Sequence, residues 1–140
     1  KFISVLLGAK SNDTRFSESA RLLDYGFSNW ESVKIEKKDM EAGVIKVKKG
    51  VTAEIPVTFS SDAFVVVRKG SRDKIEETLE IPEVVNAPVE EGQTIGVLNI
   101  DLDGERLASI PVVAAGSSEK CTLAKALAMI ISKWLTLSIK

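Results

Sequence analysis

The residues that could perform chemistry are few, and one missing residue type narrows the choice. The sequence contains no histidine, so Ser-His-Asp and Cys-His catalysis are impossible, as is any metal site that uses histidine. The nucleophile scheme that remains is Ser-Lys, in which a desolvated lysine takes the serine proton. Two Ser-x-x-Lys spacings occur, Ser71 with Lys74 and Ser117 with Lys120.

Both Ser-x-x-Lys spacings are interpreted as surface-loop or linker serines. With this many serines and lysines, a random order would give about 1.4 such pairs. A penicillin-reactive serine site also needs Ser-x-Asn or Ser-Asp-Asn and a Lys-Thr/Ser-Gly strand, and the sequence contains neither. We therefore predict no catalytic residue in this chain and no labelling of Ser71 or Ser117 by a fluorescent penicillin.

The acidic residues and the cysteine are also given structural interpretations. Asn99, Asp101 and Asp103 are spaced like the start of a calcium loop, but position twelve would be Ile110 instead of a glutamate. Glu76-Glu77 and Glu90-Glu91 are neighbours in sequence, and neighbouring side chains of a strand point to opposite faces. Neither pair could therefore act together on one glycosidic bond, and both are interpreted as solvated acids. Cys121 is the single cysteine and is given no role. We expect no metal and no cofactor.

Composition indicates a globular domain, and the net charge argues against nucleic acid as a partner. Hydrophobic residues make up 44% and charged residues 28% of 140 residues, which is typical of one globular domain with short additions. The net charge of −1 gives no overall field for nucleic acid. Charge is uneven, however, because residues 120–140 carry four lysines and no acid, which leaves −5 for residues 1–119.

Two periodicities predict the elements of the body. Residues 2–9 form a nearly continuous apolar run typical of a strand covered on both faces, and a helix follows with N-cap side chains at Asn12 and Asp13 and a stop signal at Gly26. From about 31 to 115 apolar residues alternate, and Asp103-Gly104 predicts a tight hairpin. The fold class is mainly β, a small antiparallel sandwich preceded by a strand and helix.

The C-terminal residues predict an amphipathic helix after a small-residue linker at 114–118. A helix of this length could be about 30 Å long, enough to span a bilayer, but Lys125 and Lys133 would each cost roughly 2.5–3.5 kcal/mol near its centre. A helix lying in the membrane surface buries its apolar face and leaves the lysines near anionic lipid. Docking on its own domain or on a partner helix is the alternative. The predicted membrane-surface residues are Leu123, Lys125, Leu127, Ile130, Ile131, Lys133, Trp134 and Leu135.

Two stretches near the N-terminus carry a family resemblance. Residues 2–11 (FISVLLGAKS) and 15–27 (RFSESARLLDYGF) closely resemble the end of the peptidase domain of low-molecular-mass penicillin-binding proteins, the D-alanyl-D-alanine carboxypeptidases. Residues 87–96 and the Asp103-Gly104 hairpin resemble the second domain of that family, and the C-terminal helix matches its membrane anchor in position. The chain opens without Met, and we interpret Lys1 as a cut end.

The resemblance implies a division of the chain and a function. Residues 1–29 would end the α/β peptidase domain, 30–115 would form the β-rich C-terminal domain, and 116–140 would be linker and membrane-surface helix. The parent enzyme would be a serine hydrolase that removes D-alanine from peptidoglycan peptides, at the outer face of the bacterial cytoplasmic membrane. The catalytic motifs of that family precede the part that matches Lys1, so no catalytic residue carries over.

Two hypotheses therefore stand for this chain. The first is the non-catalytic C-terminal part of such a carboxypeptidase, a pedestal and membrane anchor whose partners are the membrane surface and the missing N-terminal peptidase portion. The second is a stand-alone β-sandwich interaction module whose terminal helix docks into a protein groove or self-associates. Lipid binding without self-association distinguishes the first from the second.

Overall fold

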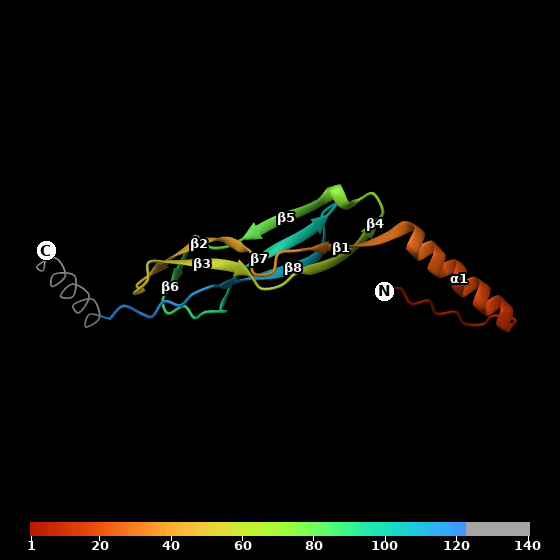
Figure 1. The fold of residues 1–140 in the computed structure, drawn as a ribbon, viewed down its shortest axis with the longest axis horizontal. Helices are drawn as coiled ribbons and strands as arrows, with labels where there is room; N and C mark the ends of the chain where they lie inside the picture. Colours follow the sequence, from red (N-terminus) through yellow and green to blue (C-terminus); the bar gives the residue numbers. More distant parts are fainter. Residues whose placement is uncertain (123–140) are drawn as a thin grey trace, which may run out of the picture.

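A computed structural model describes residues 1–122 of the chain as an elongated molecule with one α-helix, one short 3-10 helix and eight strands. Figure 1 shows the helix and the N-terminal segment at one end of the long axis and the last described residues at the other. In chain order the elements are α1 (Asn12–Asn29), β1 (Trp30–Ile35), β2 (Glu41–Lys48), β3 (Glu54–Phe59), β4 (Ala63–Arg68), the short 3-10 helix η1 (Arg72–Lys74), β5 (Ile75–Glu80), β6 (Val84–Asn86), β7 (Thr94–Leu102) and β8 (Glu105–Ala114).

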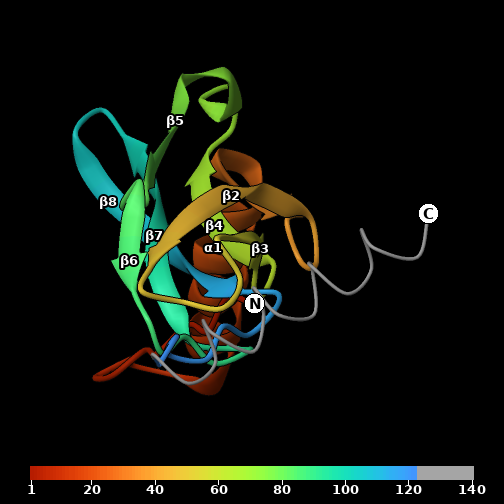
Figure 2. The same cartoon turned by 90° about the vertical axis from the view of Figure 1, so that its left-hand side faces the viewer.

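The strands form one curled sheet and a separate two-stranded ribbon. The curled sheet has the order β5-β7-β8-β3-β2-β6, and the ribbon pairs β1 with β4. β4 packs beside β8, which brings the ribbon against the curled sheet. In the end-on view of Figure 2, β6, β7 and β8 lie on the left, and β2 and β3 curve round to the right. The strands thus surround a single interior.

This arrangement confirms the mainly β prediction and corrects the expected sandwich of two antiparallel sheets. The sheets are unequal, with six and two strands, and β6 pairs with β2 in parallel at Lys46–Lys48. The physical reason is curvature, because a long twisted sheet that bends round on itself encloses a core without a second sheet of equal size. The parallel strand is only three residues long and follows a loop with Pro82.

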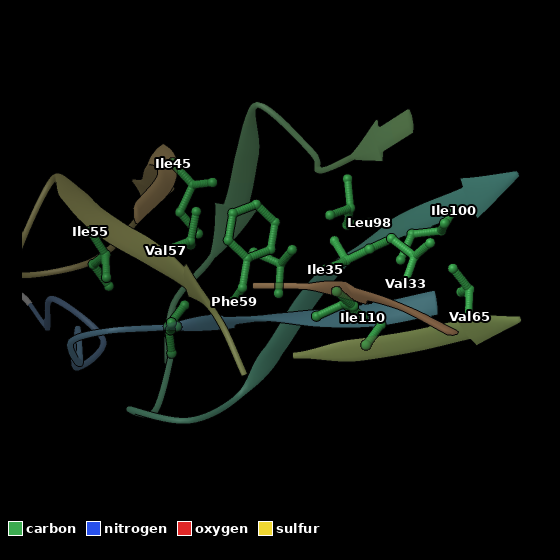
Figure 3. Close-up of a cluster of buried hydrophobic side chains, with 14 of the residues drawn as sticks. Val33, Ile35, Ile45, Ile55, Val57, Phe59, Val65, Leu98, Ile100 and Ile110 are labelled. Atoms are coloured by element: carbon green, nitrogen blue, oxygen red, sulfur yellow. The ribbon is translucent and has the colours of Figure 1, made fainter. Parts of the chain in front are cut away.

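Alternating side chains build the core as the sequence predicts. In β3, Ile55, Val57 and Phe59 point inward while Pro56 is exposed, and β1 and β4 show the same alternation. Figure 3 shows these side chains converging from different strands. The buried apolar residues are Val33, Ile35, Ile45, Val47, Ile55, Val57, Phe59, Ala63, Val65, Val67, Val89, Leu98, Ile100, Ile110, Val112 and Ala114.

The hairpin between β7 and β8 is confirmed. Leu102 pairs with Glu105, and the two residues between them have positive φ angles, 49° at Asp103 and 84° at Gly104. Two successive residues in the left-handed region match the right-handed twist of the flanking strands. The Asp-Gly pair therefore sets the register of the longest strand pair in the molecule.

Helix α1 is confirmed, but its cap differs from the prediction. The N-cap is Ser11, whose hydroxyl accepts a hydrogen bond from Thr14 N at 3.2 Å, instead of Asn12 or Asp13. Gly26 lies within the last turn, where its carbonyl accepts a hydrogen bond from the N–H of Trp30. None of the α1 residues is buried, so this helix projects from the β-rich body.

The apolar run at residues 2–9 does not form a paired strand within residues 1–122. The segment is extended without strand pairing, and Ile3, Val5 and Leu7 are 79%, 74% and 90% exposed. The other side of the segment lies against α1, where Phe2 meets Phe27 edge-on at 5.0 Å between ring centroids. An apolar run forms a stable strand only where neighbouring strands take its N–H and C=O groups. Those neighbours are not supplied by residues 10–122.

Candidate functional site

The two Ser-x-x-Lys pairs do not form catalytic sites in the described residues. Ser71 precedes η1, and its carbonyl accepts a hydrogen bond from the backbone N–H of Lys74. The Lys74 amine points to Asp103 at 4.0 Å and is 63% exposed, so it is not desolvated as a general base must be. Ser117 and Lys120 are both exposed at the surface.

The acidic residues have structural partners. Asn99 is buried, donating to Glu80 Oε1 at 2.8 Å and accepting from the Ser109 hydroxyl at 3.1 Å. Asp101 pairs with Arg106 at 3.0 Å across the hairpin, which raises the pKa of the Arg106 guanidinium. Within residues 1–122 no group of three acidic or cysteine side chains is arranged to hold a metal ion.

A cavity of about 300 Å³ lies where the free edges of β1 and β5 face each other. The Lys37 amine reaches Glu77 at 2.7 Å across this gap. Lys34 bonds to Glu36 at 2.9 Å and Asp62 at 3.2 Å, and these carboxylates raise the pKa of the Lys34 amine. Most charged groups around the cavity are therefore paired, and the Lys37–Glu77 pair is the one of these three that joins the β1 side to β5.

The C-terminal end of the described chain is attached to the β-rich body, although the sequence predicted a linker there. We call residues 115–122 the tail root. Ala115 N donates to Pro56 O at 2.9 Å, and Ser118 exchanges two backbone hydrogen bonds of 2.9 Å with Val89. These bonds place the first half of the tail root between β3 and the segment before β7.

The second half of the tail root follows the loop between β2 and β3. Val51 N donates to Glu119 O at 2.9 Å and Cys121 N to Lys49 O at 2.7 Å, on either side of a bridge between Gly50 and Lys120. Residues 119–122 are thus extended, and the predicted helix does not begin at Glu119. The chain leaves the described structure directly beside this loop.

The side chain of Ser118 joins the loop between β2 and β3 to the tail root. The hydroxyl of Ser118, which is 2% exposed, donates to Thr52 O at 2.9 Å and accepts from Thr52 N at 3.1 Å. A Cβ at Gly50 would overlap this hydroxyl, so glycine is required for the close approach. Sequence reasoning missed this attachment, because Ala-Ala-Gly-Ser-Ser has linker composition and its partners lie far away in the sequence.

The predicted membrane-surface residues lie outside the described part of the chain. They are Leu123, Lys125, Leu127, Ile130, Ile131, Lys133, Trp134 and Leu135. No helix among residues 1–122 has both the length and the apolar character to cross a bilayer. The structure thus defines where the predicted anchor is attached.

The opposite end of the molecule carries an uncovered apolar surface. Phe16, Tyr25 and Phe27 of α1 are 73%, 62% and 59% exposed. The outward side of residues 3–7 is equally bare, as described above. Exposed large apolar side chains on neighbouring segments are typical of a surface that another protein covers.

Comparison with known proteins identifies relatives over nearly the whole chain. The family described as penicillin-binding protein 5, C-terminal domain, matches residues 30–120. The D-alanyl-D-alanine carboxypeptidase DacF of Bacillus subtilis is 29% identical over 133 residues, which cover 94% of this chain and 34% of that protein. The chain thus spans about a third of the length of this curated relative.

Solved structures agree with this match. Penicillin-binding protein 5 from Haemophilus influenzae superposes with a TM-score of 0.68 and 26% identity, over 82% of this chain and 34% of that one. The D-alanyl-D-alanine carboxypeptidase DacD from Francisella tularensis gives a TM-score of 0.59 and 31% identity, over 81% of this chain and 29% of that one. The chain therefore belongs to the family of the penicillin-binding protein 5 C-terminal domain and is a C-terminal portion of a low-molecular-mass penicillin-binding protein.

Proposed function

We propose that this chain is the non-catalytic pedestal and membrane anchor of a serine-type D-alanyl-D-alanine carboxypeptidase. The family match and the relatives' names support the enzyme class. The reaction would belong to an N-terminal peptidase portion, because this sequence contains neither Ser-x-Asn nor Lys-Thr/Ser-Gly, and its two Ser-x-x-Lys spacings do not form a serine site. The β-rich body would hold that portion at a fixed distance from the membrane.

The observation that carries this proposal is the placement of the two ends. The bare apolar surface of α1 and residues 3–7 lies at one end of the long axis, and the chain leaves at Thr122 at the other. A surface of that kind favours coverage by a protein domain. The tail root fixes the origin of residues 123–140 at the far end, so a membrane there and a peptidase domain on α1 would not compete for space.

The residues of the tail support an interfacial anchor over a spanning one. A helix over 123–140 would place the apolar side chains on one face and Lys125 and Lys133 outside it. Lying flat, it would bury Trp134 at headgroup level and keep both lysines near anionic lipid. The membrane would be the bacterial cytoplasmic membrane, at its outer face, where the peptidoglycan peptides that the parent enzyme acts on are present.

Vesicle binding tests the anchor. Chains 1–140 and 1–122 are sedimented with vesicles of phosphatidylglycerol and phosphatidylcholine at low and high salt. We expect 1–140 to bind, with affinity that falls as salt rises, and 1–122 to lose most of the binding. Deletion begins at 123, because earlier residues are bonded to the body. Salt-insensitive binding, or capture of the tail by a protein without lipid preference, would favour the interaction-module hypothesis.

Fluorescent-penicillin labelling of source-cell membranes tests the enzymatic parentage. An antibody against this chain is used on the same blot. We expect it to detect a labelled band much heavier than the 15.2 kDa of this chain. If it detects only an unlabelled species of this mass, the chain does not belong to an active carboxypeptidase.

A further inference from the structure

The loop that receives the tail root is basic and carries an exposed apolar residue at its tip. Lys48 ends β2, Lys49 follows it, and Lys120 is bridged to the adjacent Gly50. All three lysines are exposed, and none of them forms a salt bridge within residues 1–122. Val51 is 39% exposed. We call Lys48, Lys49, Val51 and Lys120 the loop patch.

The backbone holds this patch in one place. Lys49 has a φ of 59° and its carbonyl accepts the hydrogen bond from Cys121 N at 2.7 Å, while Val51 N donates to Glu119 O. The Ser118 hydroxyl forms hydrogen bonds to the backbone N–H and C=O of the next residue, Thr52. The loop is therefore preorganised at the point where the chain leaves, and it moves with the root of the tail.

The charges near the patch favour an anionic partner only locally. The acids near the patch are Glu54, the strand partner of Lys46, Glu83, whose carbonyl accepts from Lys46 N, Glu90, which follows Val89, and Glu119, which lies between Ser118 and Lys120. Residues 1–119 as a whole carry −5, so the general field of the body would repel an anionic surface. The attraction to an anionic surface would therefore come from the exposed lysines of the loop patch and from the lysines of the tail sequence, and not from the net charge of the body.

We propose that the loop patch is a second lipid contact, which rests with the tail on the same anionic bilayer surface. This inference depends on the proposed membrane anchor and adds a part of the folded body to it. A tail lying flat in the interface brings its first residue to headgroup depth, and Cys121 is bonded to the loop. Val51 then reaches the headgroup layer, and the three lysines lie over anionic lipid. Two attachments would fix the tilt of the body on the membrane, which a single attachment would not.

Fluorescence at Val51 tests the position of the loop. Val51→Cys is combined with Cys121→Ser in the full chain and labelled with an environment-sensitive dye, with Lys69→Cys in the same background as control. Lys69 lies near α1, at the far end of the body. On adding phosphatidylglycerol vesicles we expect a blue shift and quenching by bromolipid at position 51 and neither effect at 69.

Charge removal tests the contribution of the lysines. Lys48→Gln/Lys49→Gln should weaken the binding of chain 1–140 to phosphatidylglycerol vesicles by roughly ten-fold, since each lysine near such a surface contributes measurably. Lys10→Gln/Lys69→Gln removes the same charge at the α1 end, where both lysines are exposed, and should leave binding within about two-fold. Vesicles of phosphatidylcholine alone should not distinguish the two variants.

The outcomes separate this inference from the anchor itself. If chain 1–140 binds vesicles while the dye at position 51 stays in water, or both lysine pairs have equal effects, the loop contact is refuted and the anchor stands. If chain 1–140 does not bind at all, the anchor fails and the loop contact with it. Circular dichroism of each variant checks that the fold is intact.

Discussion

Ser118 and Gly50 form the contact that attaches the end of the chain to the body. The serine hydroxyl satisfies both the N–H and the C=O of Thr52, and the glycine leaves the space that this hydroxyl occupies. A buried hydroxyl with two partners is stable, whereas the same space cannot hold a Cβ without a shift of Val47 and of the loop backbone.

A first prediction concerns this pair. Ser118→Ala should lower the free energy of unfolding by about 1 kcal/mol, because exposed Thr52 can turn to water for its lost bonds. Gly50→Ala should cost roughly 1–3 kcal/mol through overpacking. The double variant should cost less than the sum of the two, since the overlap with the hydroxyl is gone. Urea denaturation of chain 1–122 measures all three, and strict additivity would contradict the direct contact.

A second prediction concerns Asp62 and pH. Its Oδ1 accepts hydrogen bonds of 2.9 Å from Lys38 N and Lys37 N, and these bonds, together with the Lys34 amine, lower the pKa of the Asp62 carboxyl. A lowered folded-state pKa adds stability above the unfolded value of about 3.9, and this stability is lost as pH falls through the folded-state pKa.

Asp62→Asn should therefore be less stable than the natural chain at pH 7, and the difference should shrink below about pH 4. Urea midpoints at pH 7, 5 and 3 measure it. Asp73→Asn, at an exposed position in η1, is the control for a general change of charge. A difference that stays constant down to pH 3 would show that the carboxylate charge is not the cause.

At the scale of elements, α1 and the β-rich body depend little on each other. The helix has no buried residue, and it meets the body at its C-terminal end, where it continues into β1 and where Asn29 O accepts a hydrogen bond from Lys69 N. Its main side-chain partner is Phe2, which lies outside the body as well. Phe2 thus covers part of one side of α1, and other large apolar side chains of the helix stay exposed.

A third prediction follows for the fragment 30–122. Removing residues 1–29 should change the free energy of unfolding by less than about 0.5 kcal/mol, as for other changes outside a core. Ile55→Ala in the same fragment is the positive control and should cost about 2–5 kcal/mol, because this side chain is 1% exposed. Failure of 30–122 to fold would mean that α1 supports the body in a way that its contacts do not indicate.

The sequence predicted those elements that are determined by residues close together in the chain, and it missed those that depend on distant residues. The alternation around Ile55 and Val57 and the Asp103-Gly104 turn are encoded within a few residues, and both were confirmed. The attachment of Ser118 to Thr52 joins positions 66 apart, and no local pattern signals it. The membrane-surface residues from Leu123 to Leu135 lie outside the described residues and stay a prediction.

At the scale of the whole molecule, strand pairing among residues 1–122 is concentrated in the β-rich body. β7 is paired on both sides along most of its length, and Leu98, Asn99 and Ile100 are all buried. Residues 2–7 have the composition of a covered strand but have no neighbouring strand among residues 1–122. Apolar strand-like sequence is therefore buried in β7 but exposed at residues 3, 5 and 7.

A fourth prediction is a contrast in amide hydrogen exchange in monomeric chain 1–122. Amides of 97–101 should open only with global unfolding, while those of 2–7 should exchange nearly as fast as in an unfolded peptide. An unpaired apolar strand is also a template for pairing, so raising the protein concentration should slow exchange at 2–7 alone. Protection of 2–7 in a dilute monomer would contradict the view that this segment needs strands from outside residues 1–122, and with it the main physical reason for placing a peptidase domain at this end.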